Sequence, residues 1–130
     1  LHILVSIARA QGAKVVLSSF ATLNDPALDY FNPEVFSQLS ERQKTEVYAL
    51  MHFTPGLTSK AIFDGINVYN DTLRKVALQE QTGWVDNASQ VPHADKYFLD
   101  RVHFTKEGAA RMAENFLPVV LEQLKVSTAD

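Results

Sequence analysis

The sequence lacks cysteine, which excludes disulfide bonds, thiolate metal sites and a cysteine nucleophile. This absence identifies no compartment, so the sequence supports no prediction of localisation. Lysine and arginine form no cluster or stripe, and the formal net charge is -3. The chain therefore has no basic patch that would bind nucleic acid or anionic lipid, and neither is predicted as a partner.

No apolar run approaches the roughly 20 residues that cross a bilayer, so no membrane segment is predicted. Only five glycines and five prolines occur among 130 residues, of which 46% are hydrophobic. This composition is typical of one globular domain. The chain begins at Leu1, without methionine and already inside an apolar-periodic segment. We interpret this beginning as a truncation and expect a missing N-terminal part.

Hydrophobic periodicity predicts helices that alternate with short strands. The β-branched run at 14–17 is typical of a strand buried on both faces. Helix, glycine turn and buried strand, in that order, indicate a doubly wound α/β fold with a parallel sheet. Two parallel strands need more neighbours, so further strands are expected upstream. The predicted elements are helices over 1–11, 40–51, 61–81 and about 105–124, and strands over 14–17 and 84–86.

Local signals predict where several of these helices begin and end. Ser40 and Thr105 are good N-caps, each followed by an acidic residue in the first turn. Gly12 is predicted to close the first helix, and Gly83 the helix over 61–81.

The stretch from about 22 to 60 is predicted to be an insertion in this single domain. Asn24-Asp25-Pro26 and Asn32-Pro33 are turn signals. The length favours a lid or binding region, or equally a structural insertion. Aromatic side chains either line an acyl-binding groove or give the insertion its own small core, and the second is the safer expectation. These aromatics are Phe20, Tyr30, Phe31, Phe36 and Phe53.

Asp100 and His103 are the candidate catalytic residues, with a carboxylate three positions before an imidazole on a loop ahead of the last helix. At this spacing Asp100 can accept from the His103 Nδ1–H, which leaves Nε2 free to act as a general base. This pair would be two members of a serine-hydrolase triad. Taken alone, the spacing equally fits an ordinary surface pair.

The block Asp100-Arg101-Val102-His103-Phe104-Thr105-Lys106-Glu107-Gly108, running into an apolar helix, resembles the C-terminal block of SGNH (GDSL-type) hydrolases. Three further segments resemble other parts of that family in the same order. The resemblance therefore covers most of the chain outside the insertion. The three segments are 7–17, a helix and strand; 65–73, a helix with the Tyr69-Asn70 pair; and 82–86, a strand ending in Asp86.

The resemblance implies a three-layer α/β/α sandwich with a parallel sheet, of which residues 1–130 are the C-terminal part. It implies hydrolysis of a small-molecule ester or acylated substrate through an acyl-enzyme, without a cofactor or metal. In this scheme His103 takes the proton from the serine, and Asp100 orients the imidazole and stabilises its cation.

The sequence departs from the family at the nucleophile. It contains no Gly-Asp-Ser block, no Gly-x-Ser-x-Gly elbow and no Gly-x-Asn-Asp block for the oxyanion. Ser18, Ser19 and Ser59 stand in no nucleophile context. The first two, at the end of a strand, could line a pocket, but a structural role in capping the strand exit is the first expectation for them. The serine is therefore expected outside this chain, and the chain alone is expected to be inactive.

Two other interpretations stay open. One is a non-catalytic α/β binding domain in which the Asp-x-x-His spacing is incidental. The other is a metal-dependent hydrolase that uses His93, Asp95, Asp100 and His103 as ligands. No helical His-x-x-x-His spacing supports a metal site, and a polar loop commonly collects His and Asp for solvation alone.

Overall fold

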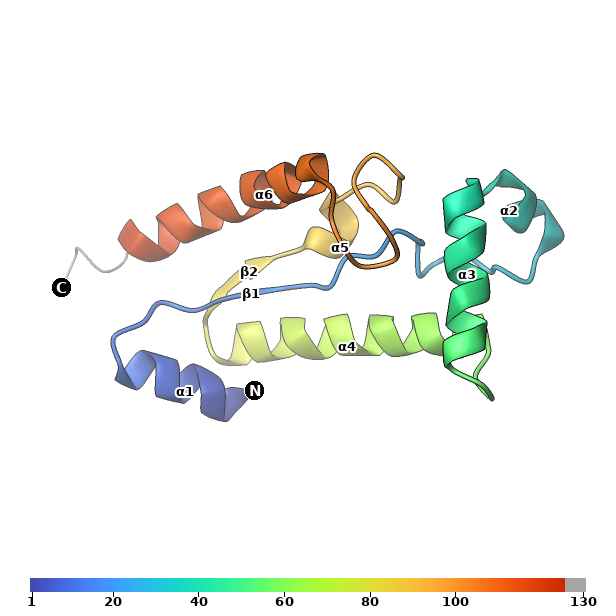
Figure 1. Cartoon of the computed structure of the whole chain (residues 1–130). Helices are drawn as coiled ribbons and strands as arrows, with labels where there is room; N and C mark the ends of the chain where they lie inside the picture. Colours follow the sequence, from blue (N-terminus) through green and yellow to red (C-terminus); the bar gives the residue numbers. More distant parts are fainter. Residues whose placement is uncertain (126–130) are drawn as a thin grey trace.

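The computed structural model describes residues 1–125, in which helices alternate with two short strands (Figure 1). Strands β1 (Val16–Ser18) and β2 (Gly83–Val85) pair in parallel, with Val16 opposite Gly83 and Ser18 opposite Val85. Helices α4 (Ser59–Gln79) and α6 (Lys106–Lys125) both contact this pair and lie on opposite sides of it (Figure 1). The predicted mixed α/β character and parallel pairing are confirmed, with two strands in the sheet of the described residues.

Helix α1 (His2–Ala10) ends as the sequence predicts. Gly12 has a φ of 76°, which is the left-handed conformation that glycine adopts without strain. Its N–H donates to Arg9 O, and the N–H of Ala13 donates to Ala8 O. These two bonds form a Schellman motif that satisfies the last carbonyls of the helix.

The predicted role of Gly83 is wrong. Helix α4 is closed by Gln81, whose φ is 51°, while the N–H of Thr82 donates to Ala77 O. Gly83 is instead the first residue of β2, and a Cβ there would lie 2.8 Å from Val119 Cγ1 on α6. The glycine is required by close packing of helix on strand, not by a turn.

The insertion contains two helices joined by a short connection. Helix α3 (Glu41–Phe53) was predicted, and its N-terminus carries a capping box: Ser40 Oγ accepts from Gln43 N, and Gln43 Oε1 accepts from Ser40 N. Helix α2 (Pro33–Gln38) was not predicted, because Asn32-Pro33 was interpreted as a turn. Asn32 Oδ1 caps this helix by accepting from Glu34 N, and Pro33 occupies its first position.

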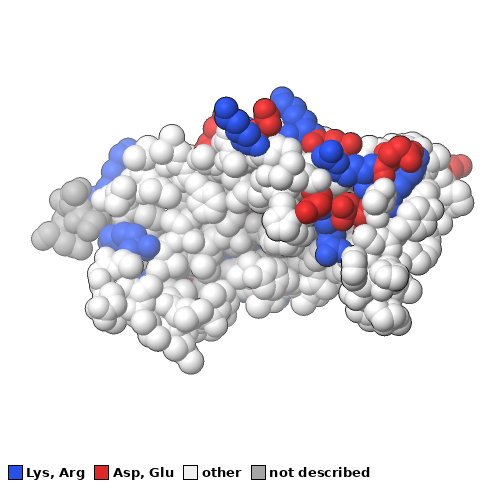
Figure 2. All heavy atoms as spheres, viewed as in Figure 1, with Lys and Arg blue, Asp and Glu red and all other residues white. Residues whose placement is uncertain are grey.

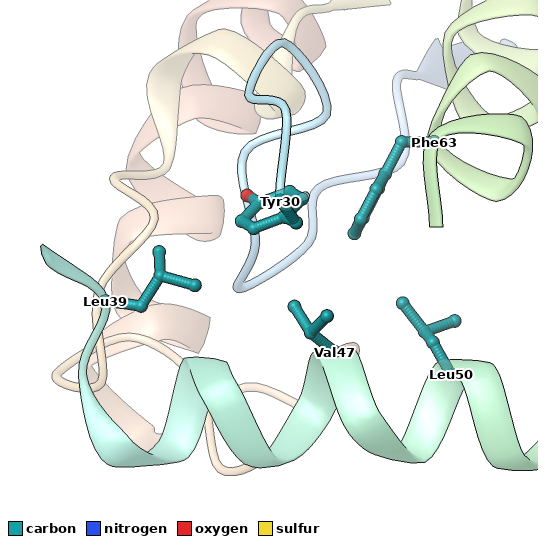
Figure 3. Close-up of a cluster of buried hydrophobic side chains, with 5 residues drawn as sticks. All are labelled: Tyr30, Leu39, Val47, Leu50 and Phe63. Carbon is teal, nitrogen blue, oxygen red and sulfur yellow. The ribbon is translucent and has the colours of Figure 1, made fainter. Parts of the chain in front are cut away.

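The insertion forms a small core together with the start of α4, so the safer of the two expectations is met in part. Tyr30 and Phe63 lie with ring centroids 4.9 Å apart, and side chains of α3 point towards them (Figure 3). Phe36 packs against this cluster, whereas three other aromatics predicted for it, Phe20, Phe31 and Phe53, are exposed and take no part in it. The buried members are Tyr30, Leu39, Val47, Leu50 and Phe63.

Removing the α3 cap is expected to destabilise the insertion. Ser40→Ala deletes the hydroxyl that accepts from Gln43 N and donates to Asp95 Oδ1 at 2.8 Å. We expect a loss of about 1 kcal/mol in the free energy of unfolding, measured by urea denaturation. Ser37→Ala, which removes an exposed hydroxyl near the end of α2, is the control. An equal unfolding midpoint for the two variants would contradict the capping role.

Several large apolar side chains on the helices are exposed. They include Ile3, Leu4 and Ile7 on α1 and Leu117 and Leu121 on α6. Figure 2 shows few charges over α1 and α4 on the face drawn, while charges gather over α6 and near α3. None of the helices in residues 1–125 combines the length and apolar character that crossing a bilayer requires.

Candidate active site

Asp100 and His103 lie on a short loop whose two ends are held together. Phe98 and Phe104 form an isolated antiparallel bridge, and the N–H of Leu99 donates to His103 O at 2.7 Å. The N–H of Thr105 donates to Tyr97 O. The segment between the two phenylalanines is therefore a closed hairpin-like loop.

Packing anchors this loop to the rest of the molecule. Phe98 is fully buried, with its ring centroid 4.9 Å from that of Phe104, in a cluster with Leu23 and Val91. The N–H of Leu23 donates to Arg101 O at 2.9 Å. A loop with a buried aromatic anchor and backbone bonds from distant segments can hold functional side chains in one place.

The structure brings the two predicted catalytic residues into contact. Nδ1 of His103 lies 2.7 Å from Asp100 Oδ2. The other carboxylate oxygen, Oδ1, accepts from the backbone N–H groups of Val102 and His103, both at 2.9 Å. The carboxylate is thus fixed on one side by the backbone and directs its second oxygen to the imidazole.

The same contacts keep Asp100 ionised. Hydrogen bonds from the backbone N–H of Val102, and then from that of His103, lower the pKa of the Asp100 carboxyl from 3.8 to about 2. Hydrogen bonds to the charged form of a carboxylate stabilise that form. Asp100 therefore carries its negative charge beside the imidazole over the whole physiological pH range.

A carbon-13 NMR titration of the Asp100 carboxyl should give a midpoint near pH 2 in the folded chain. In the chain unfolded by urea the midpoint should return to about 3.9. Because the pKa is lowered by folding, the stability it contributes is present above about pH 4 and is lost as the pH falls towards 2. Solvent screens this partly exposed carboxylate, so the effect on unfolding is small.

A His103→Ala variant separates the causes of this shift. The backbone N–H groups of residues 102 and 103 remain in the variant, so the pKa of Asp100 should stay well below its ordinary value. A midpoint that rises to that of the unfolded chain would contradict the account and assign the shift to the imidazole.

The imidazole is open to solvent. The side chain of His103 is 74% exposed, and its Nδ1 is hydrogen-bonded to Asp100. A hollow of about 370 Å³ beside the loop is lined by Tyr97, Glu107 and Arg111, but neither Asp100 nor His103 lines it. The arrangement can therefore accept a proton at an accessible Nε2, and it offers no enclosed substrate pocket around that atom.

The helix that follows the loop begins as predicted. Thr105 Oγ1 accepts from the N–H of Gly108 at 3.0 Å and donates to Lys96 O, so it is the N-cap of α6. A Cβ at Gly108 would lie 2.0 Å from the carbonyl oxygen of Tyr97. The glycine lets the first turn of α6 approach the strand-like segment that starts the loop.

Ser18 and Ser19 are held at the C-terminal end of β1, in agreement with the structural role expected there. Ser19 Oγ donates to Asp86 Oδ1 and accepts from the N–H of Ala88, both at 2.8 Å. Ser18 Oγ donates to Ser19 O and accepts from the Asn87 amide at 2.7 Å. Both hydroxyls take part in a network that joins β1 to α5 (Asn87–Gln90), a helix that was not predicted.

Asn70 links helix α4 to the chain that leaves β1. Its Oδ1 accepts from the N–H of Phe20 at 2.7 Å, and its Nδ2 donates to Phe20 O at 3.1 Å. Tyr69, the neighbour in the predicted Tyr-Asn pair, is 55% exposed. Of this pair, Asn70 therefore makes the hydrogen bonds that join α4 to the chain leaving β1.

The structure does not bring the four proposed metal ligands together. His93 Nδ1 donates to Thr22 O at 2.6 Å, and Asp95 Oδ1 accepts from Ser40 Oγ. No cluster of three or more His, Asp or Glu side chains suited to a metal ion occurs among residues 1–125. The metal-dependent interpretation has no ligand set in the described part of the chain.

Sequence reasoning missed two residues of α3 that hold the segment 93–98 leading into the loop. Arg42 donates through Nη1 to Phe98 O at 2.6 Å and to Asp95 O at 3.3 Å. Gln43 donates to His93 O at 3.1 Å. Their partners lie about 50 positions away, and no local pattern signals such contacts.

No protein-family model matches the chain, and no curated protein or solved structure matches it either.

Proposed function

We propose that this chain supplies the Asp–His part of a serine ester hydrolase, with Asp100 orienting His103. The observation that supports the proposal is the 2.7 Å contact between His103 Nδ1 and Asp100 Oδ2, on a loop anchored by Phe98. The order of segments that resemble SGNH hydrolases supports the same reaction class. The substrate class is a small carboxylic ester or acylated molecule.

In the proposed mechanism, Asp100 accepts from Nδ1–H and so fixes the tautomer in which Nε2 is the base. Nε2 removes the proton from the serine hydroxyl as it attacks the ester carbonyl, and returns it to the departing alkoxide. It then activates the water that hydrolyses the acyl-enzyme. The low pKa of Asp100 keeps a full negative charge beside the imidazolium formed in both steps.

The nucleophile of the proposal lies outside the 130 residues. Ser18 and Ser19 are hydrogen-bonded to Asn87 and Asp86, and Ser59 is buried at the start of α4. A serine and an oxyanion site would come from further strands beside β1 or β2. With those strands, α4 and α6 would form the outer layers of the three-layer α/β/α sandwich that the resemblance implies.

A fluorophosphonate probe, which labels activated serines, tests this proposal. We expect no labelling of the 130-residue chain, and labelling of a natural polypeptide that extends it and carries the serine. Labelling should be lost in His103→Ala and kept in His52→Ala, an exposed histidine on α3. If the polypeptide hydrolyses esters without being labelled, and a chelator abolishes this activity, the result would instead favour the metal-dependent hydrolase. If the extended polypeptide shows neither labelling nor activity, the result would favour the non-catalytic binding domain.

A further inference from the structure

The first turn of α3 contacts the segment that leads into the Asp100–His103 loop. Arg42 Nη1 donates to Phe98 O at 2.6 Å and to Asp95 O at 3.3 Å. Phe98 is fully buried, so its carbonyl oxygen needs a donor within the protein. Arg42 supplies that donor from a distant part of the chain.

One peptide group connects Arg42 to the backbone of the candidate base. The carbonyl of Phe98 and the N–H of Leu99 belong to the same planar peptide, and a trans peptide directs them to opposite sides. The carbonyl accepts from Arg42, while the N–H donates to His103 O at 2.7 Å. This peptide plane is therefore held at both edges, by α3 on one side and by His103 on the other.

The hydrogen bonds continue from His103 to the carboxylate. The N–H of His103 donates to Asp100 Oδ1, and its ring Nδ1 lies 2.7 Å from Asp100 Oδ2. Each bond in such a chain fixes the geometry of the next. Because the His103 side chain is mostly exposed, its orientation depends on these bonds more than on packing. A Phe98 carbonyl that is not held would let the His103 backbone turn away from the carboxylate.

A second route joins α3 to the same loop. Gln43 Nε2 donates to Leu23 O at 3.4 Å, and the N–H of Leu23 donates to Arg101 O at 2.9 Å. Val47 and Leu50 hold α3 in the core of the insertion. The position of α3 in that core is therefore linked to the loop through two sets of hydrogen bonds.

We propose that Arg42 is a positioning residue of the dyad, through which the place of α3 sets the orientation of the His103 imidazole. The insertion then regulates the base without touching Asp100 or His103. This inference rests on the proposed function for the use of the dyad in catalysis. Its test does not, because the tautomer of His103 can be measured in the 130-residue chain without a nucleophile.

Nitrogen-15 NMR of the histidines in the 130-residue chain, at a pH where the imidazole is neutral, tests the proposal. In the parent chain, we expect the Nδ1–H tautomer of His103 to predominate. In Arg42→Ala, the imidazole should return towards the Nε2–H tautomer that free histidine prefers. The Leu99 amide should exchange with solvent about 5- to 10-fold faster, as the loss of one hydrogen bond allows. Arg42→Lys, which keeps a long cationic donor, should restore most of both signals.

Lys44→Ala is the matched control, because Lys44 lies on the same helix and pairs with Glu41. It should change neither the tautomer nor the exchange of Leu99. Amide signals of α3 show whether the insertion stays folded. If Arg42→Ala unfolds it, Arg42→Gln repeats the test with a side chain too short to reach Phe98 O.

An unchanged His103 tautomer in a folded Arg42→Ala or Arg42→Gln chain would overturn the inference and leave the hydrolase proposal untouched. An equal change in Lys44→Ala would also overturn it, because the effect would then belong to α3 as a whole. Failure of the fluorophosphonate test, with the tautomer responding as expected, would refute the hydrolase and leave the link between α3 and His103 in place.

Discussion

Replacing His103 with alanine is expected to lower kcat for ester hydrolysis by on the order of 10³ or more in the polypeptide that joins this chain to its proposed serine. The variant removes the imidazole whose Nδ1 lies 2.7 Å from Asp100 Oδ2. Among the described residues, it is the only base that this carboxylate orients. The serine hydroxyl would then have no acceptor for its proton. Because the base acts in the chemical steps, KM should change much less than kcat.

The control for this prediction is a histidine with a different position. His52 is exposed on α3, so His52→Ala should leave kcat within about 3-fold. Asp100→Asn is a second informative variant, because the asparagine keeps the shape but loses the charge beside the imidazole and favours the wrong tautomer. Near-normal activity in His103→Ala would eliminate His103 as the base.

Among glycine-to-alanine substitutions in the described residues, Gly108→Ala is expected to be the most destabilising. The added Cβ would lie 2.0 Å from Tyr97 O, a distance at which the backbone itself must move. That oxygen cannot move freely, because it accepts from the N–H of Thr105. We expect a loss of about 3 kcal/mol in the free energy of unfolding, which is a melting temperature lower by roughly 10 °C.

Gly65→Ala is the matched control for this substitution. Gly65 lies inside α4, and a Cβ there would meet nothing within 4 Å. Alanine forms helix better than glycine by about 1 kcal/mol, so this variant should melt at the same or a higher temperature. Equal melting temperatures for the two variants, by circular dichroism, would show that the close approach at Gly108 is not structurally important.

Features fixed by neighbouring residues could be predicted from the sequence. The contact between Asp100 and His103 depends on three positions in one loop, and the caps at Ser40 and Thr105 depend on one turn of helix. Each is a local interaction whose geometry follows from the spacing alone. The α4 helix was predicted because its apolar period extends over many residues.

Features fixed by distant residues could not be predicted. Gly83 was interpreted as a helix terminator, yet the reason for it is Val119 on another helix. The loop that carries the dyad is held by Arg42, and nothing in the local sequence around either segment indicates that bond. Asn32-Pro33 was ambiguous for a different reason, because the same residues that favour turns also begin helices.

The parallel pairing of β1 with β2 has a consequence for the order in which the molecule folds. Val16 must meet Gly83, and α2, α3 and α4 all lie between them in the chain. Closing so long a loop is entropically costly and slow, whereas each helix forms from neighbours within microseconds. During synthesis, β1 leaves the ribosome well before its partner exists. β1 therefore cannot pair with β2 until α3 and α4 have been synthesised, and the Asp100–His103 loop, whose Arg101 O accepts from the N–H of Leu23, is made later still.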